Sequence, residues 1–310
     1  MKKLVYLSEY IHPEAFALLK ENCTVVDNFD QIEAIDAIIL RNITVTREMM
    51  QKAKNLKVIG KHGVGCNTID LSAAKELGKT VLYTPTTNIN SVAEIIVGLI
   101  LNLYRHITVA NAGVRNDEYK TIAPATLIGN EIAGKTVALI GVGNVNKKLA
   151  SILQNGFGVN INAYDPYLAG DTAEKLGMRK CATLEEAIGD ADIVTISVPL
   201  TDGTRNLISG RIFDSFKPSA ILINTARGGI VNEDDLYDAL VNKKIRLAAS
   251  DVFEVEPPTR DNNKLLSLPG FCATPHIGGS TEESLYRTGM DVVRETISVL
   301  NGNSPKHPAI

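Results

Sequence analysis

The feature that most constrains the fold is an alternation of short apolar runs with helical patterns along the chain. The runs KLVYL, CTVV, AIIL, LKVIG and TVLY indicate strands, and helical patterns at 13–21, 46–53 and 71–77 separate them. A second series starts at Lys135 with TVALIG and continues through VNINAYD, DIVTISV, AILINTA, IRLAAS and FCATP. Strands that alternate with helices favour a parallel sheet covered on both faces. The sequence therefore predicts an α/β protein with two such sheets.

Two longer helical patterns flank the second series. One covers residues 91–114 and the other residues 281–300. A polar, irregular segment after the first of them is interpreted as a crossing between domains. The final NGNSPKHPAI is predicted to be a frayed terminus, and we expect no appended regulatory domain after it. A chain of 310 residues favours about two domains.

Composition and charge exclude several classes of partner. The net charge of −3 provides no basic field to recruit nucleic acid or an anionic membrane. The longest apolar stretch, VAEIIVGLILNLY, is too short to span a bilayer, and the N-terminus is typical of a first strand, not of a signal peptide. Four scattered cysteines without a C-x-x-C pair predict neither disulfides nor a metal site. We therefore expect a cytoplasmic protein without nucleic-acid or membrane partners.

The stretch GVGNV follows an apolar strand and opens a helix, which is the setting of a dinucleotide-binding turn. Gly141 permits the tight turn, and Gly143 lets the backbone approach a pyrophosphate at the helix N-terminus. Asp165 ends the next strand, where a carboxylate binds the adenosine ribose hydroxyls and repels a 2′-phosphate. The pattern predicts an NAD site.

One residue departs from this pattern. Asn146 stands where the usual G-x-G-x-x-G fingerprint has its third glycine, which normally serves helix–strand packing. Since that glycine does not touch the phosphate, we predict that Asn146→Gly leaves NAD affinity unchanged or raises it. A large loss of affinity would mean that Asn146 makes a contact that the usual fingerprint lacks.

Three further strand ends carry residues suited to hydride-transfer chemistry. Arg227 in INTARGG offers charge and paired donors for a substrate carboxylate. His276 in TPHIGG suits proton transfer near neutral pH, and a glutamate of FEVEPP would orient its ring and hold its charged form. Taken singly, each residue is more typical of a salt-bridged surface or a loop. Because ligands bind beyond the carboxyl ends of parallel strands, their joint placement favours one active site.

The chain resembles the D-isomer-specific 2-hydroxyacid dehydrogenase family, particularly its phosphoglycerate dehydrogenase branch. The motifs that carry the resemblance include GKHGVGCNTIDLSAAKELG, TPTTNINSVAE, AYDPY, VPLTDGTRNLIS, INTARGGIVNEDDLYDAL, ASDVFEVEPP and TPHIGGSTEES. The resemblance implies two Rossmann-like, doubly wound parallel-sheet domains with the active site in the cleft between them. It assigns residues 1–99 and 283–310 to a substrate-binding domain and residues 100–282 to an NAD-binding domain.

The resemblance also implies roles for individual residues. In catalysis, Arg227 would anchor the substrate carboxylate, His276 would act as acid and base, and Glu256 would orient His276. Beside the glycines and Asp165, the implied cofactor contacts are Asn144, Val145, Val198, Pro199, Thr225, Ala226, Asp251 and Gly278. The implied substrate contacts beside Arg227 and His276 are Arg41, Lys61, Val64 and Gly65. Asn144 replaces an arginine that the family often has, which puts the strength of cofactor binding in doubt.

The substrate and the assembly follow from the same resemblance. Arg41 and Lys61 would suit a dianion such as D-3-phosphoglycerate, whose oxidation serves serine biosynthesis; plain surface charge is the alternative for both residues. Reduction of hydroxypyruvate, glyoxylate or another short 2-oxo acid is the alternative reaction. An NAD-sensing interaction protein, like the corepressors of the same superfamily, is the alternative of another class. Family members usually form homodimers through the cofactor lobe and the region of LILNLYRHI.

Overall fold

The computed structural model describes residues 2–310, which form two compact units. Unit 1 comprises residues 1–88 and 279–310 in this division, and unit 2 comprises residues 89–278. Both boundaries of this division lie earlier in the chain than residues 99 and 282, the bounds that the family resemblance implies. The first boundary precedes helix α4 (Ile89–Arg105) because this whole helix packs in unit 2, where Ala93, Ile96 and Leu99 enter a core cluster.

Unit 1 contains a five-stranded sheet in which every pair is parallel. Its spatial order is β2 (Cys23–Val26), β1 (Lys3–Leu7), β3 (Ala37–Leu40), β4 (Val58–Lys61) and β5 (Thr80–Leu82). The order reverses between β1 and β3, which is the topological switch point of a doubly wound sheet. The carboxyl ends of these two strands are therefore the expected ligand side of unit 1.

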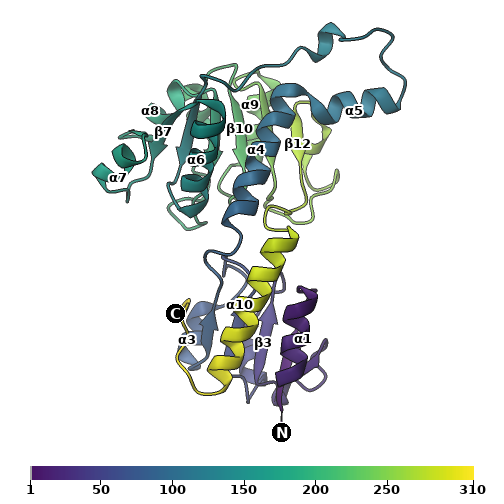
Figure 1. The fold of residues 1–310 in the computed structure, drawn as a ribbon, viewed down its shortest axis with the longest axis vertical. Coiled ribbons are helices and arrows are strands. Elements are labelled where there is room, and N and C mark those ends of the chain that lie inside the picture. Colours follow the sequence, from purple (N-terminus) through teal and green to yellow (C-terminus); the bar gives the residue numbers. More distant parts are fainter. Residues whose placement is uncertain (1) are drawn as a thin grey trace. The chain divides into compact units, whose positions relative to one another are not determined.

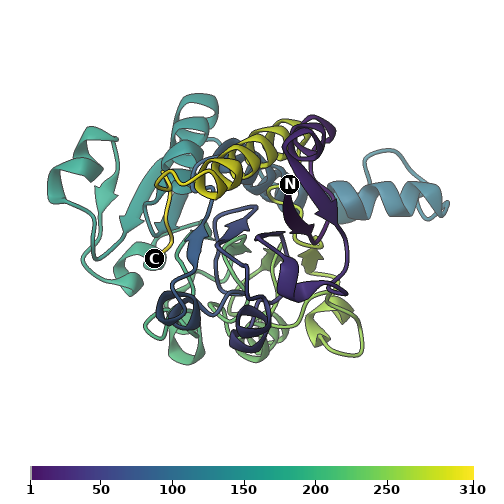
Figure 2. The ribbon, with the colours of Figure 1, turned by 90° about the horizontal axis from the view of Figure 1, so that it is seen from below.

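Helices cover both faces of this sheet (Figures 1 and 2). On one face, α1 (Pro13–Asn22) and α10 (Glu282–Leu300) lie side by side and bury Leu19 and Val292 against the strands. On the other face, α2 (Arg47–Lys52) and α3 (Leu71–Glu76) bury Met50 and Ala73. A short 3-10 helix, η1 (Ile32–Ala34), precedes β3. Strands buried on both sides explain the continuous apolar runs of the sequence.

Unit 2 contains a seven-stranded sheet that is also parallel throughout. Its order is β12 (Phe271–Ala273), β11 (Leu247–Ser250), β10 (Ile221–Asn224), β9 (Ile193–Ile196), β6 (Thr136–Ile140), β7 (Asn160–Tyr164) and β8 (Arg179–Lys180). The first strand of the unit, β6, pairs with β7 on one side and with β9 on the other. This is the switch point of the Rossmann order, so the fold class predicted from the sequence is confirmed.

The helices of unit 2 again form two layers. Helices α4 and α6 (Asn144–Phe157) pack on one face, where Leu149 and Leu153 join the core cluster of α4. The other face is covered by α8 (Leu184–Gly189), α9 (Glu233–Val241) and the 3-10 helix η3 (Gly210–Ser215). The remaining helices of the unit are α5 (Ile107–Arg115), η2 (Ala125–Leu127), α7 (Gly170–Lys175) and η4 (Lys264–Ser267).

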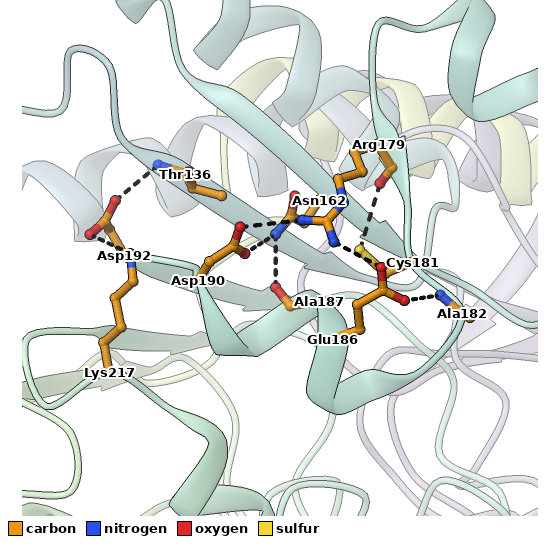
Figure 3. Close-up of polar contacts among 10 residues, drawn as sticks. All are labelled: Thr136, Asn162, Arg179, Cys181, Ala182, Glu186, Ala187, Asp190, Asp192 and Lys217. Carbon is orange, nitrogen blue, oxygen red and sulfur yellow. Dashed lines mark hydrogen bonds and ion pairs between the residues drawn. The ribbon is translucent and has the colours of Figure 1, made fainter.

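A polar network fixes the β7–β8 edge of the sheet to α8 (Figure 3). Asn162 is buried in the middle of β7, and its Nδ2 donates to the carbonyl of Ala187 and to the Asp190 carboxylate, at 3.1 Å and 2.5 Å. Arg179 on β8 donates to Glu186 and Asp190. A buried amide inside an apolar strand is tolerated because its donors are satisfied. The network holds β7, and with it the strand end that carries Asp165.

The helical pattern at 91–114 is not one helix but two. Helix α4 ends at Arg105, His106 adopts a left-handed conformation at φ 54°, and α5 begins at Ile107. The two helices meet at an angle of 61°, and α5 projects from the body of unit 2 (Figure 1). Among the described residues, no single helix has the length and apolarity to cross a membrane, and only this bent pair passes such a test by length and composition.

The C-terminal tail is not frayed, contrary to the prediction. Pro308 forms an antiparallel bridge with Leu82, and the Ala309 N–H donates to the Val81 carbonyl at 2.8 Å. His307 is held by Glu295 on α10, which accepts hydrogen bonds from its backbone and contacts its ring. The tail therefore covers the exposed edge of β5, which would otherwise present unpaired backbone groups.

Candidate functional site

The glycine turn lies at the switch point of unit 2. Gly141 follows β6 at φ 82°, a conformation that residues with a Cβ rarely adopt. An added Cβ there would stand 2.5 Å from the Ser197 carbonyl oxygen and 2.6 Å from Val198, at the end of neighbouring β9. The first glycine is therefore required by its backbone angle and by the close approach of two strand ends.

The helix that follows the turn begins without a side-chain cap. The N-cap of α6 is Gly143, whereas the side chains of Asn232 and Thr281 cap α9 and α10. Gly143 and Asn144 are exposed. The N–H groups of the first helical turn are thus available to an anion, together with the positive end of the helix dipole. This arrangement fits the pyrophosphate of a dinucleotide.

Asp165 follows β7 beside this turn. One carboxylate oxygen accepts the N–H of Val142 at 2.9 Å, and the other accepts the N–H of Tyr167 at 2.9 Å. The carboxylate is half-buried. An ionised carboxylate has about four acceptor sites, so these two bonds leave capacity for ribose hydroxyls. The same bonds fix the carboxylate against the glycine turn.

Asn146 makes a contact that the usual fingerprint lacks. Its side chain is fully buried, and its Nδ2 donates to the Gly141 carbonyl at 2.6 Å. The Oδ1 atom is buried without a hydrogen-bond partner among the described residues. A third glycine could not form this bond, so the sequence motif alone did not reveal it.

The other predicted cofactor residues lie at the same edge of the sheet, each at the end of a strand or the start of a helix. Val198 and Pro199 follow β9, Thr225 and Ala226 follow β10, and Val145 lies in the first turn of α6. Because the strands are parallel, these positions and the glycine turn share one side of unit 2. Whether they contact a cofactor stays a prediction.

His276 and Glu256 form a hydrogen-bonded pair. The Nδ1 atom of His276 lies 2.8 Å from Oε2 of Glu256, and the other carboxylate oxygen accepts the Phe253 N–H at 3.0 Å. The His276 side chain is 46% exposed, and the residue has a left-handed backbone with φ 55°. Since Nδ1 is occupied by the carboxylate, Nε2 remains for proton exchange with a substrate.

Arg227 contributes its charge to this pair. Burial by itself would raise the pKa of Glu256, but hydrogen bonds from His276 and Phe253 and the charges of His276 and Arg227 bring it below its usual value. Glu256 is therefore ionised at neutral pH, as an imidazolium partner must be. The three residues predicted to be catalytic are thus brought together at the ends of β10, β11 and β12.

Buried polar side chains hold the loops that carry these residues. Asp251 accepts the Thr274 hydroxyl and the N–H groups of Ile277 and Gly278 at 2.6–2.9 Å, which fixes both sides of His276. Asp251 is 1% exposed, so the structure shows it supporting the His276 loop, and a direct cofactor contact stays a prediction. Gly278 lies against the same carboxylate.

Two further supports were not predicted from the sequence. Asn224 accepts the Ala226 N–H and donates to the Arg227 carbonyl, which shapes the arginine loop. Glu233, at the start of α9, accepts from the Glu254 N–H and from Asn263, at 2.8 Å and 2.7 Å, and so holds the loop that carries Glu256. Burial raises the pKa of Glu233. Their only sequence signal is a polar residue beside a catalytic motif.

In unit 1, hydrogen bonds from neighbouring residues hold Arg41 at the topological switch point of the sheet. The Glu9 carboxylate, after β1, accepts the N–H groups of Arg41 and Asn42 at 2.9 Å and 2.7 Å. The Lys61 ammonium donates to the Arg41 carbonyl, and the guanidinium donates to the Ser280 hydroxyl at 2.8 Å. Arg41 is half-buried. Its backbone is held on both sides, and one guanidinium nitrogen is hydrogen-bonded to Ser280.

The loop after β4 lies beside Arg41, because Lys61 at the end of β4 donates to the Arg41 carbonyl. Lys61 and His62 are both buried, so Lys61 is not the plain surface charge that was its alternative interpretation. Val64 is 40% exposed, and the N–H groups of Val64 and Gly65 donate no hydrogen bond within residues 2–310. Their placement is compatible with the predicted binding of a carboxylate by backbone donors.

Comparisons with known proteins agree with this geometry. Residues 97–278 match the family model of the D-isomer specific 2-hydroxyacid dehydrogenase, NAD binding domain. The chain is 37% identical to a D-3-phosphoglycerate dehydrogenase of Methanocaldococcus jannaschii over 96% of its own length and 57% of that relative. It is 39% identical to a hydroxypyruvate reductase of Thermotoga maritima, over 87% of this chain and 86% of that relative.

A similar fold is found among solved structures. The TT0316 protein of Thermus thermophilus superimposes with a TM-score of 0.90 at 28% identity, covering 99% of this chain and 100% of the other. The chain spans little more than half the length of the phosphoglycerate dehydrogenase relatives, 57% in the archaeal case.

Proposed function

Because the chain belongs to the D-isomer specific 2-hydroxyacid dehydrogenases, with residues 97–278 as its NAD-binding domain, we propose that it transfers hydride between NAD and a D-2-hydroxy acid. We propose D-3-phosphoglycerate as the substrate and 3-phosphohydroxypyruvate as the product, a reaction of serine biosynthesis.

The observation that carries this proposal is the His276–Glu256 pair with Arg227 beside it. Oxidation of a hydroxy acid removes a hydride from C2 and the proton of its hydroxyl group. NAD, when bound, takes up the hydride. His276 accepts the hydroxyl proton at Nε2, and the Glu256 carboxylate stabilises the imidazolium that results. Arg227 holds the substrate carboxylate through paired donors.

The cofactor turn supports NAD in preference to NADP. The uncapped start of α6 offers N–H donors to the pyrophosphate, and the Asp165 carboxylate beside the turn repels a 2′-phosphate. Asn144 supplies no charge of its own, so the binding of the pyrophosphate rests on the backbone donors.

The substrate assignment rests on unit 1. Arg41 is positioned by Glu9 and Lys61 at the carboxyl ends of β1 and β3, and a fixed guanidinium suits the phosphate of a dianionic substrate. The names of several relatives agree with this choice.

Reduction of hydroxypyruvate is the second candidate. The Thermotoga maritima relative of that name is 39% identical over 87% of this chain. The two reactions share the Arg227, Glu256 and His276 chemistry and differ in whether a phosphate must be bound.

A homodimer and a cytoplasmic location stay predictions. The projecting arm from α5 onward supports the dimer, because its exposed apolar side chains have no cover within residues 2–310. Those most exposed are Val114, Ile122 and Ile128. An arm of this kind suits a second copy of the chain.

A substrate panel tests the proposal. The purified protein is assayed with NAD and NADP against D-3-phosphoglycerate, D-glycerate and D-lactate, and in reverse with hydroxypyruvate and glyoxylate, by absorbance of the reduced nicotinamide. We expect the highest kcat/KM with phosphoglycerate and NAD. A preference for unphosphorylated acids would support the second candidate. NAD binding without any turnover would favour an NAD-sensing interaction protein.

His276→Ala tests the assigned chemistry. We expect turnover to fall by about 10²- to 10⁴-fold, the usual contribution of a general acid or base, with NAD affinity retained. Near-normal turnover would remove His276 from the acid–base role.

Lys61→Ala tests the phosphate assignment. Loss of the ammonium releases the Arg41 carbonyl, so we expect KM to rise more for phosphoglycerate than for glyoxylate. Equal losses for both substrates would count against a phosphate contact at Arg41.

A further inference from the structure

We propose that Asn146 is a positioning residue that fixes the cofactor turn in its binding conformation before NAD arrives. The proposal rests on the proposed function in one respect, that NAD binds at this turn. It reverses the prediction from the sequence that Asn146→Gly would leave NAD affinity unchanged or raise it.

The contacts of the turn show what Asn146 adds. The Gly141 N–H donates to the Tyr164 carbonyl at 2.8 Å, and the Val142 N–H donates to Asp165 at 2.9 Å. Both bonds tie the turn to β7. The Gly141 carbonyl faces the start of α6 instead, and its partner there is the Asn146 amide at 2.6 Å. Asn146 therefore connects the first glycine to the helix whose N–H groups would receive the pyrophosphate.

Glycine makes such a connection useful. Gly141 has the left-handed backbone that the turn needs, but glycine explores more backbone conformations than any other residue. A side-chain bond to its carbonyl restricts that freedom in the ligand-free protein. Since a binding site that is ordered in advance loses less entropy on binding, the bond should appear as cofactor affinity.

The cost of Asn146 argues against a purely structural role. Its Oδ1 atom is buried without a partner in the described part of the chain, and an unpaired buried acceptor is destabilising. An alanine or a glycine would avoid that cost. The donor end must face Gly141, because Oδ1 in its place would set two acceptor oxygens against each other. The side chain therefore combines one bond to the turn with an acceptor atom that is left unpaired.

The chain offers a matched control on the same helix. Asn155 is exposed on α6, and its Nδ2 donates to the Ser151 carbonyl at 2.8 Å, far from the turn. Asn146→Gly and Asn155→Gly introduce the same change in helix propensity, but only the first removes the bond to Gly141. Asn146→Ala removes that bond while keeping a good helix former.

The first measurement is NAD affinity by titration calorimetry, combined with steady-state kinetics. Asn146→Gly and Asn146→Ala should weaken NAD binding about three- to tenfold, as expected for one lost hydrogen bond. The kcat at saturating NAD and the KM for the hydroxy acid should not change, and Asn155→Gly should match the wild type. NAD binding as tight as wild type, or tighter, in both Asn146 variants would overturn the proposal.

The second measurement does not depend on NAD. Hydrogen exchange of the ligand-free protein reports the N–H groups of Gly141 and Val142, which are both hydrogen-bonded. They should exchange faster in the Asn146 variants and not in Asn155→Gly, and unchanged exchange would refute the fixing role. Absence of NAD binding in the wild type would instead refute the cofactor assignment, so the two failures are distinguishable.

Discussion

Acidification should destabilise unit 1 through His62, whose imidazole is buried at the end of β4. Burial and the neighbouring charges of Arg41 and Lys61 lower the pKa of His62 from 6.5 to about 4. The residue is 6% exposed, and its Nε2 has no hydrogen-bond partner among the described residues, so a positive charge on the ring would lack compensation there. The folded protein therefore holds His62 neutral.

Because the pKa of His62 is lower in the folded protein than in the unfolded chain, the direction of the change in stability with pH is determined. Between pH 6.5 and pH 4 the unfolded chain binds a proton at His62 that the folded chain does not bind, so stability falls as the pH falls through this window. At 1.36 kcal/mol for each pKa unit, the full loss is about 3 kcal/mol, of which about 2 kcal/mol occurs between pH 7 and pH 5. This is a substantial part of the stability of an ordinary domain.

The comparison of wild type with His62→Gln isolates this contribution, because glutamine does not titrate. Unfolding in urea would be measured at pH 7 and at pH 5. Hydrogen exchange of peptides from β3 and β4 serves as the probe, because these strands report the unfolding of unit 1 alone. Between pH 7 and pH 5, the free energy of unfolding of the wild type should fall by about 2 kcal/mol more than that of the variant. NMR of the imidazole protons gives the same answer directly, with the His62 signals identified by their absence in the variant. Equal pH dependence in both proteins, or a His62 midpoint near that of a free histidine, would refute the reasoning.

Two further substitutions in unit 2 test Arg227 and the His276–Glu256 pair. Arg227→Lys should raise the KM for the hydroxy acid about tenfold or more, because a point charge cannot copy paired donors, and an unchanged KM would remove Arg227 from the anchoring role. Glu256→Gln should lower kcat about ten- to a hundredfold, since the charged hydrogen bond to His276 is lost, while the Kd of NAD stays constant. A kcat close to wild type would show that His276 needs no carboxylate.

The layered fold could be predicted from the sequence because it depends on local patterns. The apolar runs at 3–7, 23–26 and 37–40 coincide with β1, β2 and β3. Every residue of β3 is buried, as expected for a central parallel strand, whereas β1 and the edge strand β2 are buried only in part. The two-residue strand β8 was missed, because Arg179 and Lys180 are exposed and carry no such signal. The break at His106 was also missed, since the apolar period continues through it from α4 to α5.

The candidate site was predicted to the extent that it follows strand ends. Arg227, Glu256 and His276 come after three parallel strands, and the topology alone brings such positions to one edge. The supports behind them could not be found in this way. Glu233 acts on a loop that begins far along the chain, and its role depends on a distance that only packing determines.

Buried polar residues mark the limit of reasoning from motifs. Lys61 and Asn146 both occupy motif positions: Lys61 is predicted to contact the substrate, and Asn146 stands at a position that does not touch the phosphate. A motif records where such residues lie in the chain and not what surrounds them. The structure assigns both to backbone carbonyls, Lys61 to that of Arg41 and Asn146 to that of Gly141. In each case a buried side chain holds the backbone of a residue beside the expected ligand. Affinity at both sites should therefore depend on how these two side chains hold the backbone, and a substitution there should change binding through the position of that backbone.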